Sequence, residues 1–313
     1  MNVLVPRRLK KGDLIGVICP ASPVNDPSRI ERGVRYLESI GYRTTVGRNA
    51  LQRRGYLAGT DEERAADIHA MFADKHVRGI FCARGGYGTP RLLSLLDYRL
   101  IARNPKIFVG YSDITALALA LWRKCRLVTY HGPMLAVDLF ADVNPFAEES
   151  FWRVLTSPER RATLAPADAS PAQVRYPGSA TGRLLGGNLS LLVSLLGTPY
   201  MPYLRGGILF LEETGEDPYR VDRMLTHLGN AGVLSRSAGV AIGRFTDCVP
   251  GDAAAPSLPL ETILAEAAEN TGRPFLTGFP IGHERRMVTV PVGIRALLDA
   301  DKGVITLLEP ATA

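Results

Sequence analysis

The chain has 313 residues, of which 46% are hydrophobic and 22% are charged, as in ordinary globular proteins and unlike disordered ones. Lys and Arg number 37 against 31 Asp and Glu, so the net charge is +6 and is spread along the sequence. This pattern favours a mildly basic, solvated surface over a nucleic-acid interface, which concentrates its charge. The length fits one large domain or two of moderate size.

The first half of the chain alternates short apolar runs with segments of helical periodicity. We expect strands at residues 14–19, 43–46, 77–83, 107–110 and 127–130. We expect helices at residues 30–40, 61–73, 90–96 and 113–124. Repeated strand–helix units of this kind predict a parallel sheet with helices on both faces.

Periodicity fails from residue 156 to residue 182, where Ala, Pro, Ser and Arg dominate. We therefore expect an N-terminal α/β domain at 1–155, a linker at 156–182 and a C-terminal domain at 183–313. The last part is mixed, with helices expected at 188–196, 221–228 and 263–269 and strands at 207–212, 238–245, 288–298 and 304–308. The predicted fold class is α/β, with a parallel-sheet first domain and a mixed, β-rich second domain.

The positions of the four cysteines indicate the redox state of the compartment in which the protein resides. Cys19, Cys82, Cys125 and Cys248 are widely separated, which is typical of reduced thiols and not of a disulfide framework or a metal cluster. The first apolar run is too short for the core of a signal peptide, and no segment is long enough to span a membrane. We expect a cytoplasmic protein with no membrane contact.

The sharpest local signal is an apolar strand that turns into a helix at Gly110-Tyr111-Ser112-Asp113. Such a turn holds a hydroxyl above the carboxyl edge of a parallel sheet, next to the backbone N–H groups of the following helix. Ser112 is thus a candidate nucleophile, with helix capping by Ser112 or Asp113 as the alternative. The full Gly-x-Ser-x-Gly pattern is absent, because Thr115 stands after Ile114.

A second glycine-rich turn, residues 83–88, also follows a strand. Its glycines allow close approach of backbone amides, so the turn is a candidate oxyanion or anion site, or else only a tight turn. It lacks the spacing of a nucleotide-binding loop.

A serine nucleophile needs a base and an orienting acid. His131 follows a strand, and His283 lies in a glycine-flanked loop, where an imidazole can be oriented; both remain candidates from the residues alone. The expected strand at 207–212 delivers Glu212 and then Glu213, which alternate faces, so only one can point at a given site. No pattern of metal-ligand spacing accompanies them, and we expect no metal.

Seven landmarks in this order resemble the LD-carboxypeptidase family of muramoyl-tetrapeptide carboxypeptidases, which also includes microcin-immunity peptidases. They are residues 83–88, 110–113, His131-Gly132-Pro133-Met134, Gly186-Gly187-Asn188-Leu189, 209–213, 218–225 and Gly282-His283-Glu284. They run across nearly the whole chain, and the set in register is far more specific than any single one.

The resemblance implies a triad in which Ser112 attacks the peptide carbonyl, His283 transfers the proton and Glu212 orients His283. It also implies an oxyanion hole from the backbone N–H groups of Asp113 and Gly86, two domains with the triad at their interface, a homodimer and no cofactor. The implied reaction releases the C-terminal D-alanine of a murein tetrapeptide during cell-wall recycling.

Recognition of a free carboxylate requires a nearby cation, and we expect Arg84 to supply it because its loop borders the site. We expect Asn188 to contact the substrate as well. Two alternatives stay open: an immunity-type peptidase that cleaves a peptidyl-nucleotide antibiotic, and a non-catalytic α/β protein that binds an anion at the glycine-rich turn.

Overall fold

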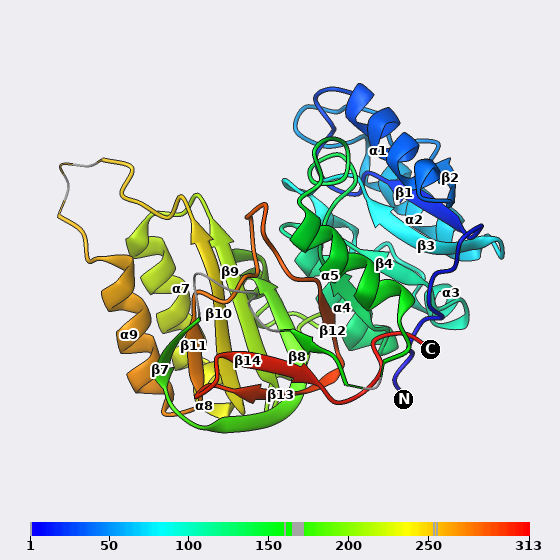
Figure 1. The fold of residues 1–313 in the computed structure, drawn as a ribbon. Helices are drawn as coiled ribbons and strands as arrows, with labels where there is room; N and C mark the ends of the chain where they lie inside the picture. The colour runs from blue at the N-terminus through cyan, green and yellow to red at the C-terminus, as the bar shows by residue number, and fades with distance from the viewer. Residues whose placement is uncertain (1, 160, 165–171, 253, 255) are drawn as a thin grey trace.

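The computed structural model describes residues 2–159, 161–164, 172–252, 254 and 256–313. The chain forms two lobes, each built around its own β-sheet (Figure 1). The first sheet is mostly parallel and the second is mixed, so the predicted two-part α/β fold class is confirmed.

A six-stranded sheet in the order β12-β5-β4-β3-β1-β2 forms the centre of the N-terminal lobe. Its parallel strands are β1 (Leu14–Ile18), β2 (Arg43–Val46), β3 (Val77–Cys82), β4 (Ile107–Val109) and β5 (Thr129–His131). Parallel strands all end at one edge of a sheet, so the segments that follow β1, β3, β4 and β5 meet there. This edge carries both the serine turn and the glycine-rich turn.

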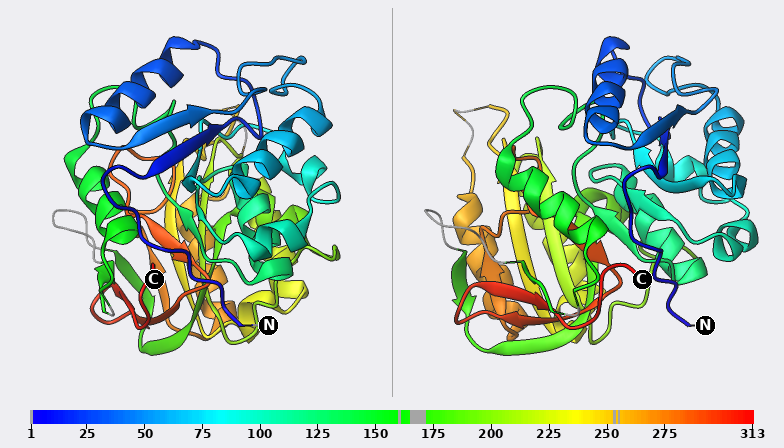
Figure 2. Two further views of the ribbon diagram at one scale, coloured as in Figure 1. Left: turned by 90° about the vertical axis from the view of Figure 1, so that its right-hand side faces the viewer. Right: turned by 45° about the vertical axis from the view of Figure 1, so that its right-hand side comes forward.

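Helices cover both faces of this sheet (Figure 2). They are α1 (Ser28–Ser39) and α5 (Pro145–Thr156) on one face and α2 (Asp61–Ala73), α3 (Tyr98–Arg103) and α4 (Ile114–Cys125) on the other. Nearly every residue of α4 is buried, and this helix also contacts β8, α6 and β12. A helix that is apolar all round fits this position between the lobes.

The C-terminal lobe has an eight-stranded sheet in the order β6-β14-β13-β8-β9-β10-β11-β7. Four central strands are parallel: β8 (Ser179–Asn188), β9 (Ile208–Thr214), β10 (Gly239–Thr246) and β11 (Phe275–Thr277). The antiparallel strands are β6 (Thr163–Leu164), β7 (Gln173–Tyr176), β13 (Arg295–Asp299) and β14 (Val304–Leu307). The helices are α6 (Leu189–Ser194), α7 (Pro218–Asn230), α8 (Val233–Arg236) and α9 (Leu260–Thr271).

The segment expected to be a linker, 156–182, differs from that expectation where the structure describes it. It supplies β6, β7 and the start of β8, all within the second sheet. β6 and β7 lie at the two edges of this sheet and β8 lies inside it, and pairing with neighbouring strands compensates for weak local propensity. Residues 160 and 165–171 of this segment lie outside the described residues.

The segment after β11 crosses from one lobe to the other. β11 belongs to the second sheet, whereas β12 (Val290–Val292) pairs antiparallel with β5 in the first. The continuous strand expected at 288–298 is therefore two strands, because Gly293, with a φ of 102°, turns the chain between β12 and β13. His283 lies on this crossing segment.

The expected helix at 90–96 is only a short 3-10 helix, η1 (Thr89–Leu92). Asp97 starts a new helix, α3, by accepting hydrogen bonds from the backbone N–H groups of Arg99 and Leu100. The other expected elements are present with ends that differ by a few residues. Within the described part of the chain, no helix has the length and apolar character needed to cross a membrane.

Candidate active site

Ser112 occupies a strained turn between β4 and α4. Its φ is 63°, in the left-handed region that residues with a side chain rarely adopt. A Cβ on Gly110 would lie 2.9 Å from the Ile114 side chain, so a glycine is required where the strand turns into the helix. The sequence thereby builds a sharp strand–turn–helix in which the serine is half-buried and the helix start lies directly behind it.

The glycine-rich turn after β3 approaches Ser112 closely. A Cβ on Gly85 would lie 3.0 Å from the Ser112 Cβ and 3.2 Å from its Oγ, so no larger residue fits there without a shift. Among the described residues, the backbone N–H groups of Gly86 and Asp113 have no hydrogen-bond acceptor. Two free N–H groups near one hydroxyl can bind a developing oxyanion.

Asp113 fastens the two turns to each other. Its carboxylate Oδ2 accepts the backbone N–H of Thr89 at 2.8 Å, and its carbonyl accepts the Thr89 hydroxyl. Asp113 is buried, and burial raises the pKa of its carboxyl, an effect that the Thr89 hydrogen bonds oppose. The residue that follows the serine therefore also fixes the end of the loop that carries Gly86.

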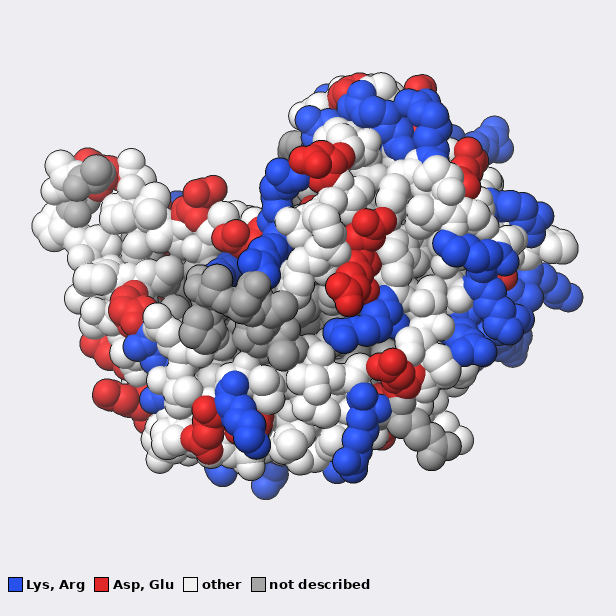
Figure 3. All heavy atoms as spheres, viewed as in Figure 1, with Lys and Arg blue, Asp and Glu red and all other residues white. Residues whose placement is uncertain are grey.

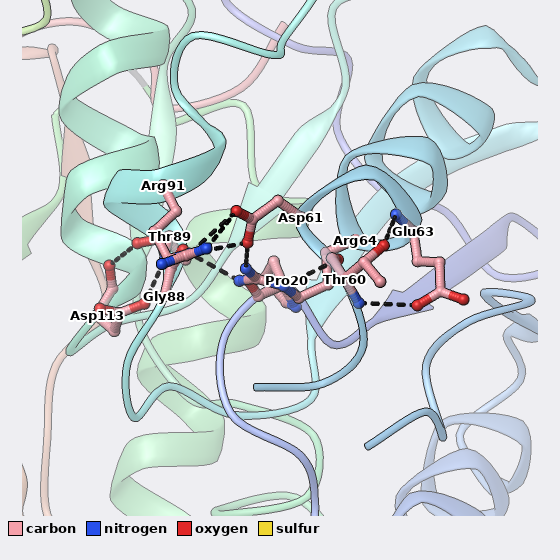
Figure 4. A network of polar contacts seen from close by, with 9 residues as sticks. All are labelled: Pro20, Thr60, Asp61, Glu63, Arg64, Gly88, Thr89, Arg91 and Asp113. Carbon is pink, nitrogen blue, oxygen red and sulfur yellow. Dashed lines mark hydrogen bonds and ion pairs between the residues drawn. The ribbon is translucent and has the colours of Figure 1, made fainter. Parts of the chain in front are cut away.

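A buried arginine holds the other side of that loop (Figure 4). The Arg64 side chain is fully buried; its Nη1 donates to the carbonyls of Pro20, at 2.6 Å, and Gly88, at 3.0 Å. Its Nη2 forms an ion pair with Asp61, and the Asp61 carboxylate also accepts hydrogen bonds from the Arg91 guanidinium. Arg64 thus joins the loops after β1 and β3 at the edge where Ser112 lies, and nothing in the sequence analysis singled it out.

Glu212 and His283 meet through a short hydrogen bond. Their Oε2 and Nδ1 atoms are 2.7 Å apart; the glutamate side chain is fully buried, whereas that of the histidine is 20% exposed. Gly282 makes the approach possible, since a Cβ there would lie 3.1 Å from the Glu212 Cβ. With Nδ1 bound to the carboxylate, Nε2 is the nitrogen left to exchange protons.

Two contacts bring this pair to the serine turn. Asn188 is opposite Glu212 in the β8–β9 register, and its backbone N–H donates to the Thr115 hydroxyl, one helical turn after Ser112, at 3.0 Å. The ring of Tyr111 meets the His283 ring edge-on, with centroids 4.9 Å apart. The three expected triad residues therefore lie at one junction between the lobes.

The net effect of its surroundings raises the pKa of His283. Burial alone would lower the pKa, but the hydrogen bond and charge of Glu212, together with the charges of Glu213 and Asp138, outweigh burial. An imidazole in this setting accepts a proton readily and is stabilised once it is charged.

Glu213 points away from this pair and has a different set of partners. It accepts hydrogen bonds from the Asn188 side-chain amide and from the backbone N–H groups of Ser190 and Thr214, at 2.8 to 2.9 Å. Asn188 also caps α6 through its Oδ1, which accepts from Leu191. The two neighbouring carboxylates are thus divided between a histidine and a structural network, as strand alternation requires.

Family profiles match both lobes: the LD-carboxypeptidase N-terminal domain at residues 15–132 and the LD-carboxypeptidase C-terminal domain at residues 181–298. The chain belongs to the LD-carboxypeptidase family. It is 43% identical over 295 residues to a probable murein peptide carboxypeptidase of Bacillus subtilis, covering 94% of this chain and 91% of that one.

Two solved structures have folds similar to that of this chain. A muramoyltetrapeptide carboxypeptidase from Oxalobacter formigenes is 34% identical with a TM-score of 0.82, covering 94% of this chain and 97% of that one. MccF in complex with glutamyl sulfamoyl guanosine is 28% identical with a TM-score of 0.90, covering 99% and 100%.

Arg84, the expected carboxylate anchor of this LD-carboxypeptidase family member, lies in the glycine-rich turn and is half-buried. Its guanidinium donates to the backbone carbonyls of Gly85, at 3.2 Å, and Pro23, at 3.1 Å. These contacts brace the two loops that surround the serine. Asn188, the other expected substrate contact, is buried, with both ends of its amide bound to protein groups.

Tyr111 and Asp138 lie next to His283, and neither was predicted as a site residue from the sequence. The Tyr111 hydroxyl is 3.5 Å from the Asp138 carboxylate, which also accepts the backbone N–H of Met134 at 2.8 Å. Burial raises the pKa of Asp138 to about 6, although the Met134 hydrogen bond and the charge of His283 oppose the rise. The only indication of Tyr111 in the sequence was its position directly before Ser112 in the serine turn.

The surface is hollowed between the two lobes at the upper edge in Figure 3. A cavity of about 530 Å³ lies on the C-terminal lobe, with Arg244, Phe245 and Glu284 in its wall, next to the His283 loop.

Within the described ranges, no group of three or more His, Cys, Asp or Glu residues is arranged to hold a metal ion.

Proposed function

We propose that this protein is a serine carboxypeptidase that hydrolyses the L,D-peptide bond of murein tetrapeptides and releases the C-terminal D-alanine in cell-wall recycling. The single observation that carries the proposal is the 2.7 Å contact of Glu212 with His283 beside a serine in a left-handed turn. The names of the Bacillus subtilis and Oxalobacter formigenes relatives support the substrate class.

In the proposed mechanism, the Ser112 hydroxyl oxygen attacks the scissile carbonyl carbon while Nε2 of His283 removes the hydroxyl proton. Glu212 holds Nδ1 and stabilises the imidazolium that forms. The tetrahedral intermediate collapses when His283 returns the proton to the D-alanine nitrogen, which leaves as an amine. A water molecule then hydrolyses the acyl-enzyme by the same steps in reverse order.

The oxyanion of both tetrahedral states is placed against the N–H groups of Asp113 and Gly86. One such donor typically contributes about 10²- to 10³-fold in kcat. The Thr89–Asp113 and Arg64–Gly88 contacts keep the two donors in position before the substrate arrives, so little reorganisation is needed during the reaction.

Arg84 remains our proposed anchor for the terminal carboxylate, through guanidinium N–H groups that do not donate to the Gly85 and Pro23 carbonyls. The variant Arg84→Ala is expected to weaken binding of the tetrapeptide more than that of its C-terminally amidated analogue. Equal losses for the two peptides would remove this role. Asn188 is proposed to contribute indirectly, by fixing the end of β8 beside Glu212.

A second candidate function has specific support from MccF, whose structure holds glutamyl sulfamoyl guanosine. The same triad can cleave the acyl bond of a peptidyl-nucleotide antibiotic if the pocket accepts the nucleoside. Turnover of acyl-sulfamoyl adenylates, measured beside D-alanine release from tetrapeptide, separates the two activities. Tight anion binding with no turnover of either substrate would favour a non-catalytic protein.

The test is mass spectrometry of murein tetrapeptide after incubation with the protein. We expect loss of one alanine with the parent protein and with Ser194→Ala, a control that changes an exposed serine on α6. With Ser112→Ala the peptide should stay intact, because removal of a triad nucleophile costs about 10⁶-fold in kcat. Unchanged peptide in all three samples would overturn the proposed activity.

We also propose a cytoplasmic homodimer that acts on a small peptide, without nucleic-acid or membrane partners. All four cysteines are buried and unpaired in the structure, in keeping with a reducing compartment. Light scattering on the purified protein measures the mass of the assembly, and a monomer at micromolar concentration would exclude the dimer.

A further inference from the structure

In the described part of the chain, Oε1 of Glu212 and Nε2 of His131 are buried polar atoms near the Glu212–His283 pair without a hydrogen-bond partner. Glu212 is fully buried and His131 is 3% exposed, so bulk water does not satisfy them. A buried polar atom without a hydrogen bond costs about 1–3 kcal/mol, and native proteins seldom tolerate it without a functional or solvent-mediated reason.

The two side chains lie in the same part of the interface. The His131 ring stands edge-on to Phe210, with centroids 5.5 Å apart, and Phe210 shares one face of β9 with Glu212, two residues later. The ring of Tyr111 contacts His131 at 5.8 Å and His283 at 4.9 Å. His131 therefore lies behind the Glu212–His283 pair, on the side of the first sheet.

Charge and protonation fit a role for His131 as a neutral donor. Burial lowers the pKa of His131 to about 4; the charge of Glu212 raises it and the charge of His283 lowers it. A neutral imidazole carries one proton, on either Nδ1 or Nε2. Next to a carboxylate, the form with the proton on Nε2 gains a hydrogen bond that the other form cannot make.

We propose that neutral His131 donates its Nε2–H towards Oε1 of Glu212 through one buried water, and is a positioning residue of the triad. This inference rests on the triad proposed above. With Oε1 bound to His131 through this water and Oε2 bound to His283, the carboxylate has no freedom to rotate. His283 is then kept in the tautomer that leaves Nε2 free to act as the base.

The charged groups around His283 determine how its pKa should change when His131 is replaced. Glu212 and Glu213 act on His283 from β9, and Asp138 acts from the segment after β5. His131 is neutral, so its replacement removes a hydrogen bond and not a charge. Without that hydrogen bond, more of the charge of Glu212 is available to the imidazolium, so the pKa of His283 should rise further.

The first experiment does not depend on any enzymatic activity, so its failure is distinguishable from failure of the proposed function. The ring nitrogens of ¹⁵N-histidine-labelled protein are observed by NMR at neutral pH, and the His131 signals are assigned by their loss in His131→Gln. We expect a neutral ring with a slowly exchanging proton on Nε2. A proton on Nδ1, or a charged ring, would overturn the proposal.

A matched pair of variants tests the role in the reaction. Glutamine in His131→Gln can place an N–H near the position of Nε2, whereas leucine in His131→Leu fills similar volume without a donor. We expect His131→Gln to keep most of the activity and His131→Leu to lose about 10- to 100-fold in kcat, with KM little changed. In His131→Leu, the rise of kcat with pH should also have its midpoint at a higher pH, because the pKa of His283 is raised. Equal activity of the two folded variants would contradict the proposal; if the leucine variant does not fold, the NMR result decides.

Discussion

The two lobes contribute to the site in different ways. The N-terminal lobe presents Ser112 through backbone geometry: a left-handed turn, a glycine in close approach, and loops tied together by Asp113 and Arg64. The C-terminal lobe presents Glu212 and His283 through one side-chain hydrogen bond between a strand end and a crossing segment. The proposed nucleophile is thus fixed by many contacts, whereas the proposed base is fixed by few.

This difference indicates where substitutions act. In the N-terminal lobe, small steric changes at backbone positions should displace the hydroxyl or the oxyanion donors without altering any ionisable group. In the C-terminal lobe, loss of one carboxylate should change both the orientation and the pKa of the histidine.

The neighbouring carboxylates on β9 give the largest expected contrast. Glu212→Gln should lower kcat by about 10³- to 10⁴-fold, because an amide favours the wrong tautomer of the histidine. Glu213→Gln should leave kcat within a few-fold but lower the free energy of unfolding by about 1–3 kcal/mol, because a buried acceptor of three hydrogen bonds is replaced. Steady-state kinetics and urea unfolding of both variants make the comparison, and similar kcat losses in the two would contradict the assignment.

In the N-terminal lobe, the matching test is Gly85→Ala. The added Cβ meets Ser112 at 3.0 to 3.2 Å, so the hydroxyl or the loop must shift by a few tenths of an ångström. We expect kcat to fall by about 10- to 100-fold with little change in thermal stability. The control is Gly229→Ala on α7, where an added Cβ meets nothing within 4 Å and activity should be unchanged. Full activity of Gly85→Ala would show that the close approach is not needed.

The pH dependence of kcat/KM tests the electrostatics of the C-terminal lobe. As the proposed base, His283 must be neutral to accept a proton, and its pKa lies above the ordinary value of 6.5. We therefore expect kcat/KM to rise with pH through a midpoint above 6.5. In Glu212→Gln the raising influence is removed and burial dominates, so the midpoint should move to lower pH. The same midpoint in the two proteins would show that Glu212 does not raise the pKa of the proposed base.

Much of the fold was predictable, because the apolar strands and amphipathic helices of the first lobe follow simple periodicities. The strain at Ser112 was also signalled by an abrupt strand–helix junction. Other features depend on contacts between distant segments: Arg64 binds carbonyls of two other loops, and β12 joins a sheet whose other strands lie more than 150 residues earlier. Local patterns carry no information about such partners.

For the candidate site, strand alternation separated Glu212 from Glu213 but did not say which one faces a histidine. The choice of His283 over His131 came from the family resemblance and not from the local sequence. The structure places His283 on Glu212 and leaves His131 buried behind the pair. Burial and ring contacts, which decide this difference, arise only in the folded chain.

Asp138, at the junction of the lobes, gives the smallest expected effect. Its pKa in the folded protein, about 6, lies above the ordinary value of 3.8, so the folded state holds the proton more tightly and loses stability as pH rises through that window. Asp138→Asn should therefore raise the free energy of unfolding by about 1–2 kcal/mol at pH 7 and by little at pH 4. Chemical denaturation at the two pH values measures this, and an equal change at both would disprove the electrostatic cause.

The central claim is that Ser112 is a nucleophile activated by His283. The most direct measurement is the rate of covalent labelling by a fluorophosphonate, followed by intact mass and peptide mapping, in the parent protein and in His283→Ala. We expect a single adduct on Ser112 in the parent protein and labelling at least about 10³-fold slower in the variant. An adduct on another residue, no adduct, or equal rates in the two proteins would contradict the account.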